Sequence, residues 1–150
     1  MKRLLLIAGI SATFATTTPA FAMTDAECAA AWTKADVDKD GIVTEREAGR
    51  YFAALRVKGT PIADGKLPQA VFLEHCKADH FTVAKLDAGA PLPGSNSFTE
   101  AQAKDRIMAA GYSGVKPLKK DAQGVWRGSA IDGSKTVSVA VDYKGNVVAK

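Results

Sequence analysis

Residues 36–47, DVDKDGIVTERE, decide how the N-terminal half of this chain folds. Carboxylates occupy the first, third, fifth and last positions of this stretch and a glycine the sixth, which is the spacing D-x-[DN]-x-[DN]-G-x5-E. Ca²⁺ is a hard cation that binds about six to eight oxygen atoms, and carboxylates this close together repel one another without a cation. The stretch therefore predicts one Ca²⁺ site with these ligands: Asp36, Asp38, Asp40, the backbone carbonyl of Ile42, Thr44 and Glu47.

Helices are predicted on both sides of this loop. Three are expected in the region, over about residues 25–35, 45–56 and 68–78. Thr24 and Glu27 have the spacing of a capping box at the start of the first helix. Thr44 and Glu47 have the same spacing at the start of the second, so an acidic turn that only caps a helix is the alternative interpretation of the loop. A helix cap, however, does not require the three preceding aspartates.

By these residues the region 24–80 resembles an EF-hand pair. The resemblance implies a second loop, and residues 60–71, TPIADGKLPQAV, align with it on Gly65. Ile62 and Val71 stand where the third and twelfth positions of a working loop carry oxygen ligands. The resemblance thus implies a second loop that keeps the fold without an ion. On this register, one residue of each loop faces its counterpart in a short sheet: Val43 and Leu67.

The cysteine content predicts a disulfide. The chain has two cysteines, Cys28 and Cys76, and in an oxidising compartment such a pair is expected to be bonded. The EF-hand resemblance places them within bonding reach, on the first and last helices of the pair. The alternative is a transition-metal site that adds His75 and His80 to the two cysteines, although no C-x-x-C spacing supports it.

The first residues have the pattern of a signal peptide, residues 1–22. Lys2 and Arg3 precede an apolar run, and the small residues Ala20 and Ala22 offer a cleavage site. The alternative is an N-terminal membrane anchor, but a span needs about 20 apolar residues and this run is shorter. We therefore expect a mature protein that begins at Met23 and is periplasmic or secreted, with no membrane association after cleavage.

The rest of the chain predicts a linker over residues 86–97 and a separate module over residues 98–150. Pro, Gly, Ser and Asn dominate the linker, whereas the module begins with a capping box at Thr99. A helix to about residue 110 and then strands over about residues 125–131 and 137–143 are expected, because the second of these strands alternates apolar and polar residues. With the EF-hand pair over residues 23–85, the predicted fold class is α+β.

The module resembles PepSY domains. Three segments carry this resemblance: FTEAQA at 98–103, GVWRG at 124–128 and VDYKGNVV at 141–148. It implies a helix followed by a short antiparallel meander, and an extracytoplasmic role in binding a protein or modulating a protease. It implies no catalytic residue.

The function expected from the sequence is that of an exported Ca²⁺-binding protein whose ion is structural or buffering. The alternative is a protein-interaction or protease-modulating module stabilised by a structural Ca²⁺. We do not expect an enzyme, because G-x-S-x-G, phosphate-loop and H-E-x-x-H motifs are absent from the sequence. We do not expect nucleic-acid binding either, because no basic run is interleaved with aromatics.

The net charge is −2 over residues 23–97 and +4 over residues 98–150, and we expect two weakly coupled units.

Overall fold

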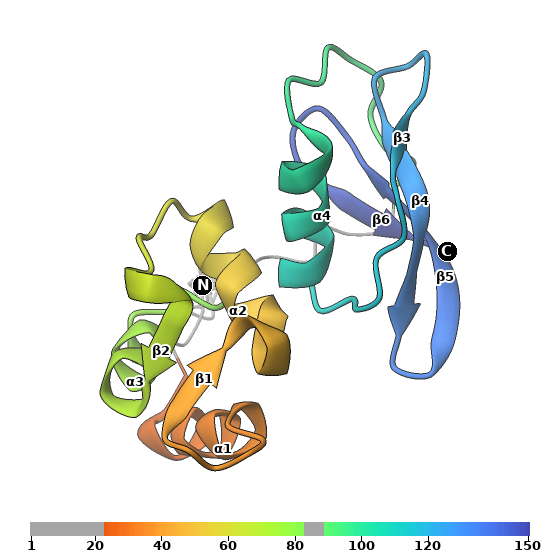
Figure 1. The fold of residues 1–150 in the computed structure, drawn as a ribbon. Coiled ribbons are helices and arrows are strands. Elements are labelled where there is room, and N and C mark those ends of the chain that lie inside the picture. The colour runs from red at the N-terminus through yellow and green to blue at the C-terminus, as the bar shows by residue number, and fades with distance from the viewer. Residues whose placement is uncertain (1–22, 83–88) are drawn as a thin grey trace, which may run out of the picture.

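The computed structural model describes residues 23–82 and 89–150. The predicted signal peptide and the first residues of the predicted linker lie outside these ranges. The described residues form an α+β fold, as predicted, with four α-helices, one two-stranded sheet and one four-stranded antiparallel sheet (Figure 1). Among them, no helix combines the length and the apolar character that crossing a membrane requires.

The N-terminal half, residues 23–82, contains three helices joined by two loops. Its elements are α1 (Asp25–Ala35), β1 (Ile42–Thr44), α2 (Glu45–Val57), η1 (Ala63–Gly65), β2 (Lys66–Pro68) and α3 (Gln69–Lys77). Helix α1 begins where predicted because the Thr24 side chain accepts from the Glu27 N–H and the Glu27 carboxylate accepts from the Thr24 N–H. The predicted third helix is confirmed, but Pro68 precedes it as the N-cap.

The two loops are joined by the antiparallel pair β1 and β2, in the predicted register. Val43 is opposite Leu67, and both side chains are buried. Both belong to one buried cluster that also contains Phe52, Leu55 and Phe72. Four aromatic rings contact one another edge-on or tilted at centroid distances of 4.7–5.4 Å: Trp32, Tyr51, Phe72 and Phe81.

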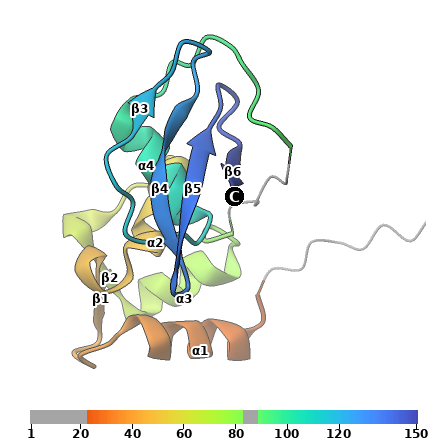
Figure 2. The ribbon, with the colours of Figure 1, turned by 90° about the vertical axis from the view of Figure 1, so that its right-hand side faces the viewer.

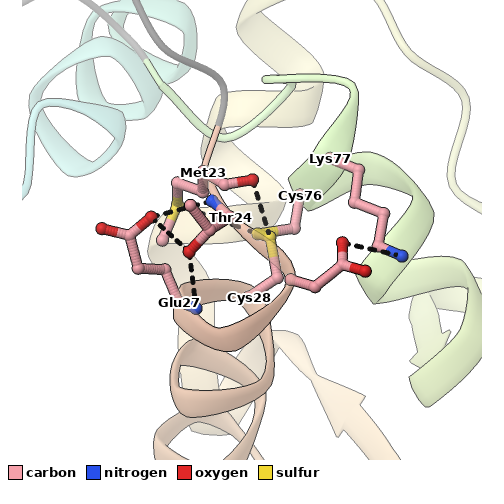
Figure 3. Close-up of a disulfide and its surroundings, with 7 residues drawn as sticks. Met23, Thr24, Glu27, Cys28, Cys76 and Lys77 are labelled. Atoms are coloured by element: carbon pink, nitrogen blue, oxygen red, sulfur yellow. Dashed lines mark hydrogen bonds and ion pairs between the residues drawn. A yellow bond between two sulfur atoms is a disulfide. The ribbon is translucent and has the colours of Figure 1, made fainter.

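The predicted disulfide is confirmed between Cys28 on α1 and Cys76 on α3, with an S–S distance of 2.00 Å. Figure 3 shows the bond beside the Thr24 cap, and Lys77 pairs with Asp25 across the same two helices. Both cysteines are buried. The bond occupies both sulfur atoms, so the alternative Cys/His metal site is wrong for this oxidised chain.

The C-terminal half, residues 89–150, is one helix against a four-stranded meander. Its elements are α4 (Glu100–Ala109), β3 (Lys119–Lys120), β4 (Trp126–Asp132), β5 (Lys135–Val141) and β6 (Val147–Ala149), and the strand order is β3-β4-β5-β6. Ala103 and Ile107 of α4 pack on Val139 and Val141 of β5. Strand β5 ends at Val141, two residues before the predicted end, because the buried Asp142 carboxylate starts a turn by accepting later backbone N–H groups.

The described part of the predicted linker belongs to the C-terminal half. The Leu92 N–H donates to Asp142 Oδ2, and the Gly94 N–H donates to a backbone carbonyl of the turn before β4. Asn96 is buried and donates through its side-chain amide to the carbonyl of Val141. Gly, Ser and Asn therefore serve here as turn and hydrogen-bonding residues, and the prediction of a spacer over this segment is wrong from Leu92 onward.

The expectation of few contacts between the two halves is also wrong. Helix α2 packs along α4 (Figures 1 and 2). Ala53, Ala54 and Ala109 bury one another at this contact. Alanines have short side chains, which let two helices approach closely. At the edge of this contact the guanidinium of Arg56 donates to both carboxylate oxygens of Asp105, at 2.9 and 2.7 Å. The capping boxes that suggested separate units start the helices but do not determine how they pack.

Candidate metal centre

The loop 36–47 folds back on itself between α1 and α2. Asp36 caps the C-terminus of α1, where its N–H donates to the Trp32 carbonyl at 2.9 Å. The backbone then takes left-handed conformations at Lys39 (φ 62°) and Gly41 (φ 84°). Gly41 adopts this conformation without steric cost, whereas at Lys39 it is uncommon. These two turns direct the aspartate side chains of the loop toward one point.

Three of the predicted ligands come together at that point. One oxygen from each of Asp36, Asp38 and Asp40 lies within 4.8 Å of the other two. Each carboxylate also accepts one backbone N–H: Gly41 to Asp36 Oδ2, Asp40 to Asp38 Oδ1 and Ile42 to Asp40 Oδ1, at 3.2, 3.2 and 2.8 Å. These bonds fix the orientation of the side chains and leave a second oxygen on each. The three aspartates can therefore hold a metal ion.

Two carboxylate oxygens of the loop are buried without a hydrogen-bond partner. They are Oδ1 of Asp36 and Oε1 of Glu47, at the first and last positions of the stretch. Asp36 as a whole is only 7% exposed. A buried polar atom that lacks a partner typically costs about 1–3 kcal/mol, and more when it is charged. A cation or a hydrogen-bond donor that bound these two oxygens would therefore stabilise both ends of the loop.

Glu47 has a second role at the start of α2. Its Oε2 accepts from the Thr44 N–H at 2.9 Å, which is the carboxylate half of the predicted capping box, and also from the Thr44 hydroxyl at 2.6 Å. These two bonds, that of the hydroxyl above all, hold the pKa of Glu47 below its ordinary value of 4.5. The next residue, Ala48, has non-helical dihedrals (φ −141°, ψ 53°), so the helix is interrupted directly after the carboxylate.

Repulsion between neighbouring carboxylates dominates the electrostatics of the loop. The Asp40 N–H lowers the pKa of Asp38, but partial desolvation and the charges of Asp40 and Glu47 outweigh it, so the pKa of Asp38 lies above its ordinary value of 3.8. Glu45, at the tenth position of the loop, pairs with Arg56, but none of the ion pairs of the described residues involves a carboxylate of the predicted ligands. A cation bound between the aspartates would relieve this repulsion.

The other predicted ligands lie near the cluster without joining it. Glu47 is not a member of the group of oxygens within 4.8 Å, and the Thr44 hydroxyl donates to Glu47. Ile42 is half-buried in β1. In the second loop Asp64 is exposed and has φ 52°, and no other cluster of three ligand side chains occurs among the described residues.

The sequence interpretation missed one contact, between His75 and His80. Helix α3 ends at Lys77, and His80 lies beyond it. The two Nδ1 atoms are 3.0 Å apart. The signal that could have indicated this contact is the pair of histidines five residues apart across a helix end.

Comparisons with known proteins add no identity to these observations. No family model matches the sequence, and no match was found among curated proteins or solved structures.

Proposed function

We propose that this is an exported protein that binds one Ca²⁺ in the loop 36–47, in the manner of an EF-hand. The observation that carries the proposal is the pair of buried, unpartnered oxygens, Asp36 Oδ1 and Glu47 Oε1. The three aspartates between α1 and β1 supply further oxygens close by. The proposed ligands are those predicted from the spacing: Asp36, Asp38, Asp40, the carbonyl of Ile42, Thr44 and Glu47.

The chemistry of the donors favours Ca²⁺ over other common divalent ions. The side-chain donors of the loop are oxygens, which suit hard cations, whereas Zn²⁺ prefers sulfur and nitrogen. Mg²⁺ demands near-ideal octahedral geometry and keeps several of its waters. A twelve-residue loop with carboxylates at its first, third, fifth and last positions supplies the larger and more flexible shell that Ca²⁺ accepts.

The ion is proposed to be structural or buffering. The disulfide ties α1 to α3 and so opposes the separation of helices by which sensor proteins expose a binding surface. Methionine-rich surfaces are typical of such sensors, and the mature sequence has only Met23 and Met108. Bound Ca²⁺ would instead offset the repulsion among the loop carboxylates and stabilise the turn from α1 into α2.

Calorimetric titration of the oxidised protein with Ca²⁺ tests this proposal. One ion per chain is expected, with a Kd between about 1 µM and 1 mM, as single and extracellular sites show. Glu47→Gln and Asp36→Asn should each weaken binding at least about tenfold, because each removes a negative charge from the shell. Asp64→Asn is the matched control, since it removes a carboxylate from the second loop and should leave the affinity unchanged.

Two bound ions, or affinity that survives in Glu47→Gln, would contradict the assignment. Titration with Mg²⁺ in parallel checks the identity of the ion. If Mg²⁺ binds as tightly as Ca²⁺, the loop is a metal site but is not selective for Ca²⁺.

A second candidate function is a protein-interaction or protease-modulating module in which Ca²⁺ is structural. A groove between the start of α2 and the loop after α4 favours it. Its lining includes these basic and large apolar side chains: Lys34, Arg46, Arg50, Tyr51, Met108 and Tyr112. Glu47 and Ala48 also line the groove, so the proposed ion would stabilise one side of the groove. The groove would suit an acidic segment of an extracytoplasmic protein.

This candidate predicts that Arg46→Ser/Arg50→Ser abolishes inhibition or capture of such a protein while the Ca²⁺ affinity stays the same. Protease assays with and without Ca²⁺ would measure the first effect, and calorimetry the second. Equal partner binding by the variant and the unaltered protein would reject the groove as the interaction site.

A further inference from the structure

The two histidines of the chain face each other at the C-terminal end of α3. The Nδ1 atoms of His75 and His80 are 3.0 Å apart, and the ring planes meet at 39°. Both side chains are half-buried, so solvent and ions still reach them. The pair lies on a different loop from the aspartates and uses different donor atoms.

The backbone holds this pair in place. The His80 N–H donates to the His75 carbonyl at 2.9 Å, and the Asp79 N–H donates to the Cys76 carbonyl at 3.1 Å. Asp79 between them takes the left-handed conformation (φ 55°). This is the Schellman arrangement that ends many helices, and it returns the chain so that the residue after the turn lies beside the last helical turn.

Each histidine also has a buried neighbour in the sequence that anchors it. Cys76, next to His75, is bonded to Cys28 of α1. Phe81, next to His80, is 4% exposed and packs on the Tyr51 and Phe72 rings. The imidazoles are therefore carried by a backbone fixed on both sides, and little conformational entropy remains to be lost when both bind one ligand.

We propose that His75 and His80 form a second metal site, through their two Nδ1 atoms, for a divalent transition-metal ion that prefers imidazole, such as Cu²⁺ or Zn²⁺. Zn–N bonds of about 2.0–2.1 Å at tetrahedral or right angles place two ligand nitrogens about 2.8–3.4 Å apart. The observed separation of 3.0 Å lies within this range. The remaining coordination positions are taken by water.

The protonation state of His75 permits this binding. Burial, and next the charge of His80, hold the pKa of His75 below its ordinary value of 6.5, although the Glu74 carboxylate opposes them. A neutral imidazole is the form that binds metals. For both Nδ1 atoms to bind one ion, a ring that carries its proton on Nδ1 changes to the Nε2–H tautomer, so a neutral pair releases no proton.

The site is distinct from the proposed Ca²⁺ site in its preference for ions. The affinity of two imidazole nitrogens for divalent ions follows the order Ni²⁺ < Cu²⁺ > Zn²⁺ and is low for Ca²⁺, which prefers oxygen. At saturating Ca²⁺ a functional aspartate loop is occupied, so Zn²⁺ is left to the histidine pair. The imidazole nitrogen signals report on that pair alone, whether or not the aspartate loop binds Ca²⁺.

The test uses the intact, oxidised protein without a polyhistidine tag, titrated with Zn²⁺ by calorimetry and by ¹H–¹⁵N spectra of the imidazole nitrogens. One Zn²⁺ per chain is expected, with both Nδ1 resonances shifting and both Nε2 resonances moving less. His75→Gln and His80→Gln should each weaken binding at least about tenfold, the loss that even outer-shell changes produce at metal sites. Glu74→Gln is the matched control on the same helix turn: it removes a carboxylate that is not a ligand, and its Zn²⁺ affinity should change far less than that of the histidine variants.

Two results would overturn the proposal. One is undiminished binding in the double variant His75→Gln/His80→Gln. The other is an unaltered protein whose Nδ1 resonances stay still up to about 1 mM Zn²⁺, which would make the contact a hydrogen bond only. The imidazole spectrum of the unaltered protein keeps the test decisive should a variant fail to fold.

Discussion

Removing the disulfide should destabilise the N-terminal half by about 4 kcal/mol, the largest effect that we expect from any single cross-link or contact in this chain. The perturbation is Cys28→Ala/Cys76→Ala. The two residues are separated by 48 positions, and a loop of that length loses about 4 kcal/mol of closure entropy from the unfolded chain when it is closed. Alanine is chosen because a serine hydroxyl would be buried at positions that are 0% and 1% exposed.

The assay is urea unfolding with Ca²⁺ chelated, followed by the fluorescence of Trp32. Trp126 is replaced by phenylalanine in every sample, so that the signal comes from the N-terminal half alone. With a typical slope of about 1–2 kcal/mol per molar urea, the midpoint should fall by about 2–4 M. Reduced but otherwise unaltered protein is the matched control, because it retains both sulfur atoms and loses the cross-link alone.

The two samples separate cross-linking from packing. The reduced protein should lose most of the 4 kcal/mol, and the alanine variant about 1 kcal/mol more for the small cavities left at each site. If the reduced protein loses less than about 1 kcal/mol, the cross-link does not restrict the unfolded chain as the loop length requires. The reasoning would then be refuted even though the bond exists.

Two further predictions concern the contact between the halves and one turn of the sheet module. A double-mutant cycle with Arg56→Met and Asp105→Asn should give a coupling energy of about 1 kcal/mol in chemical denaturation, because the ion pair is bidentate but partly exposed. A coupling energy near zero would mean that the alanine contact alone joins α2 to α4. Gly124→Ala should cost at least about 2 kcal/mol, because the residue has φ 76° and its Cβ would collide with the Gly94 carbonyl. Gly133→Ala, at φ 61° with open space around it, should cost only about 1 kcal/mol, and equal losses in thermal unfolding would show that the collision does not matter.

The sequence alone determined the features that depend on local spacing. Thr24 and Glu27 start α1 because a cap needs only two side chains three residues apart. The convergence of Asp36, Asp38 and Asp40 follows similarly, since they are separated by single residues and the left-handed turns lie between them. Pairing of the two cysteines also followed from composition, because no other partner exists in the chain.

Features that depend on distant segments were decided only by the tertiary structure. Asn96 and its neighbours read as a linker in sequence, because the composition of a spacer and of a hydrogen-bonded turn segment is the same. What distinguishes them is the Val141 carbonyl, which folding brings to the Asn96 amide across 45 positions of the chain. Composition contains no information about that partner.

The same reason explains the contact between the halves and the histidine pair. Ala53 and Ala109 appear in the sequence as residues that merely favour helix, and their mutual burial arises from the packing of α2 on α4. His75 and His80 are five positions apart, and their rings meet only because the left-handed turn at Asp79 ends α3 and returns the chain. Periodicity and spacing describe what a segment can form by itself. The burial of apolar side chains from the whole fold determines the direction that the chain takes after a helix ends and the surface that it then contacts.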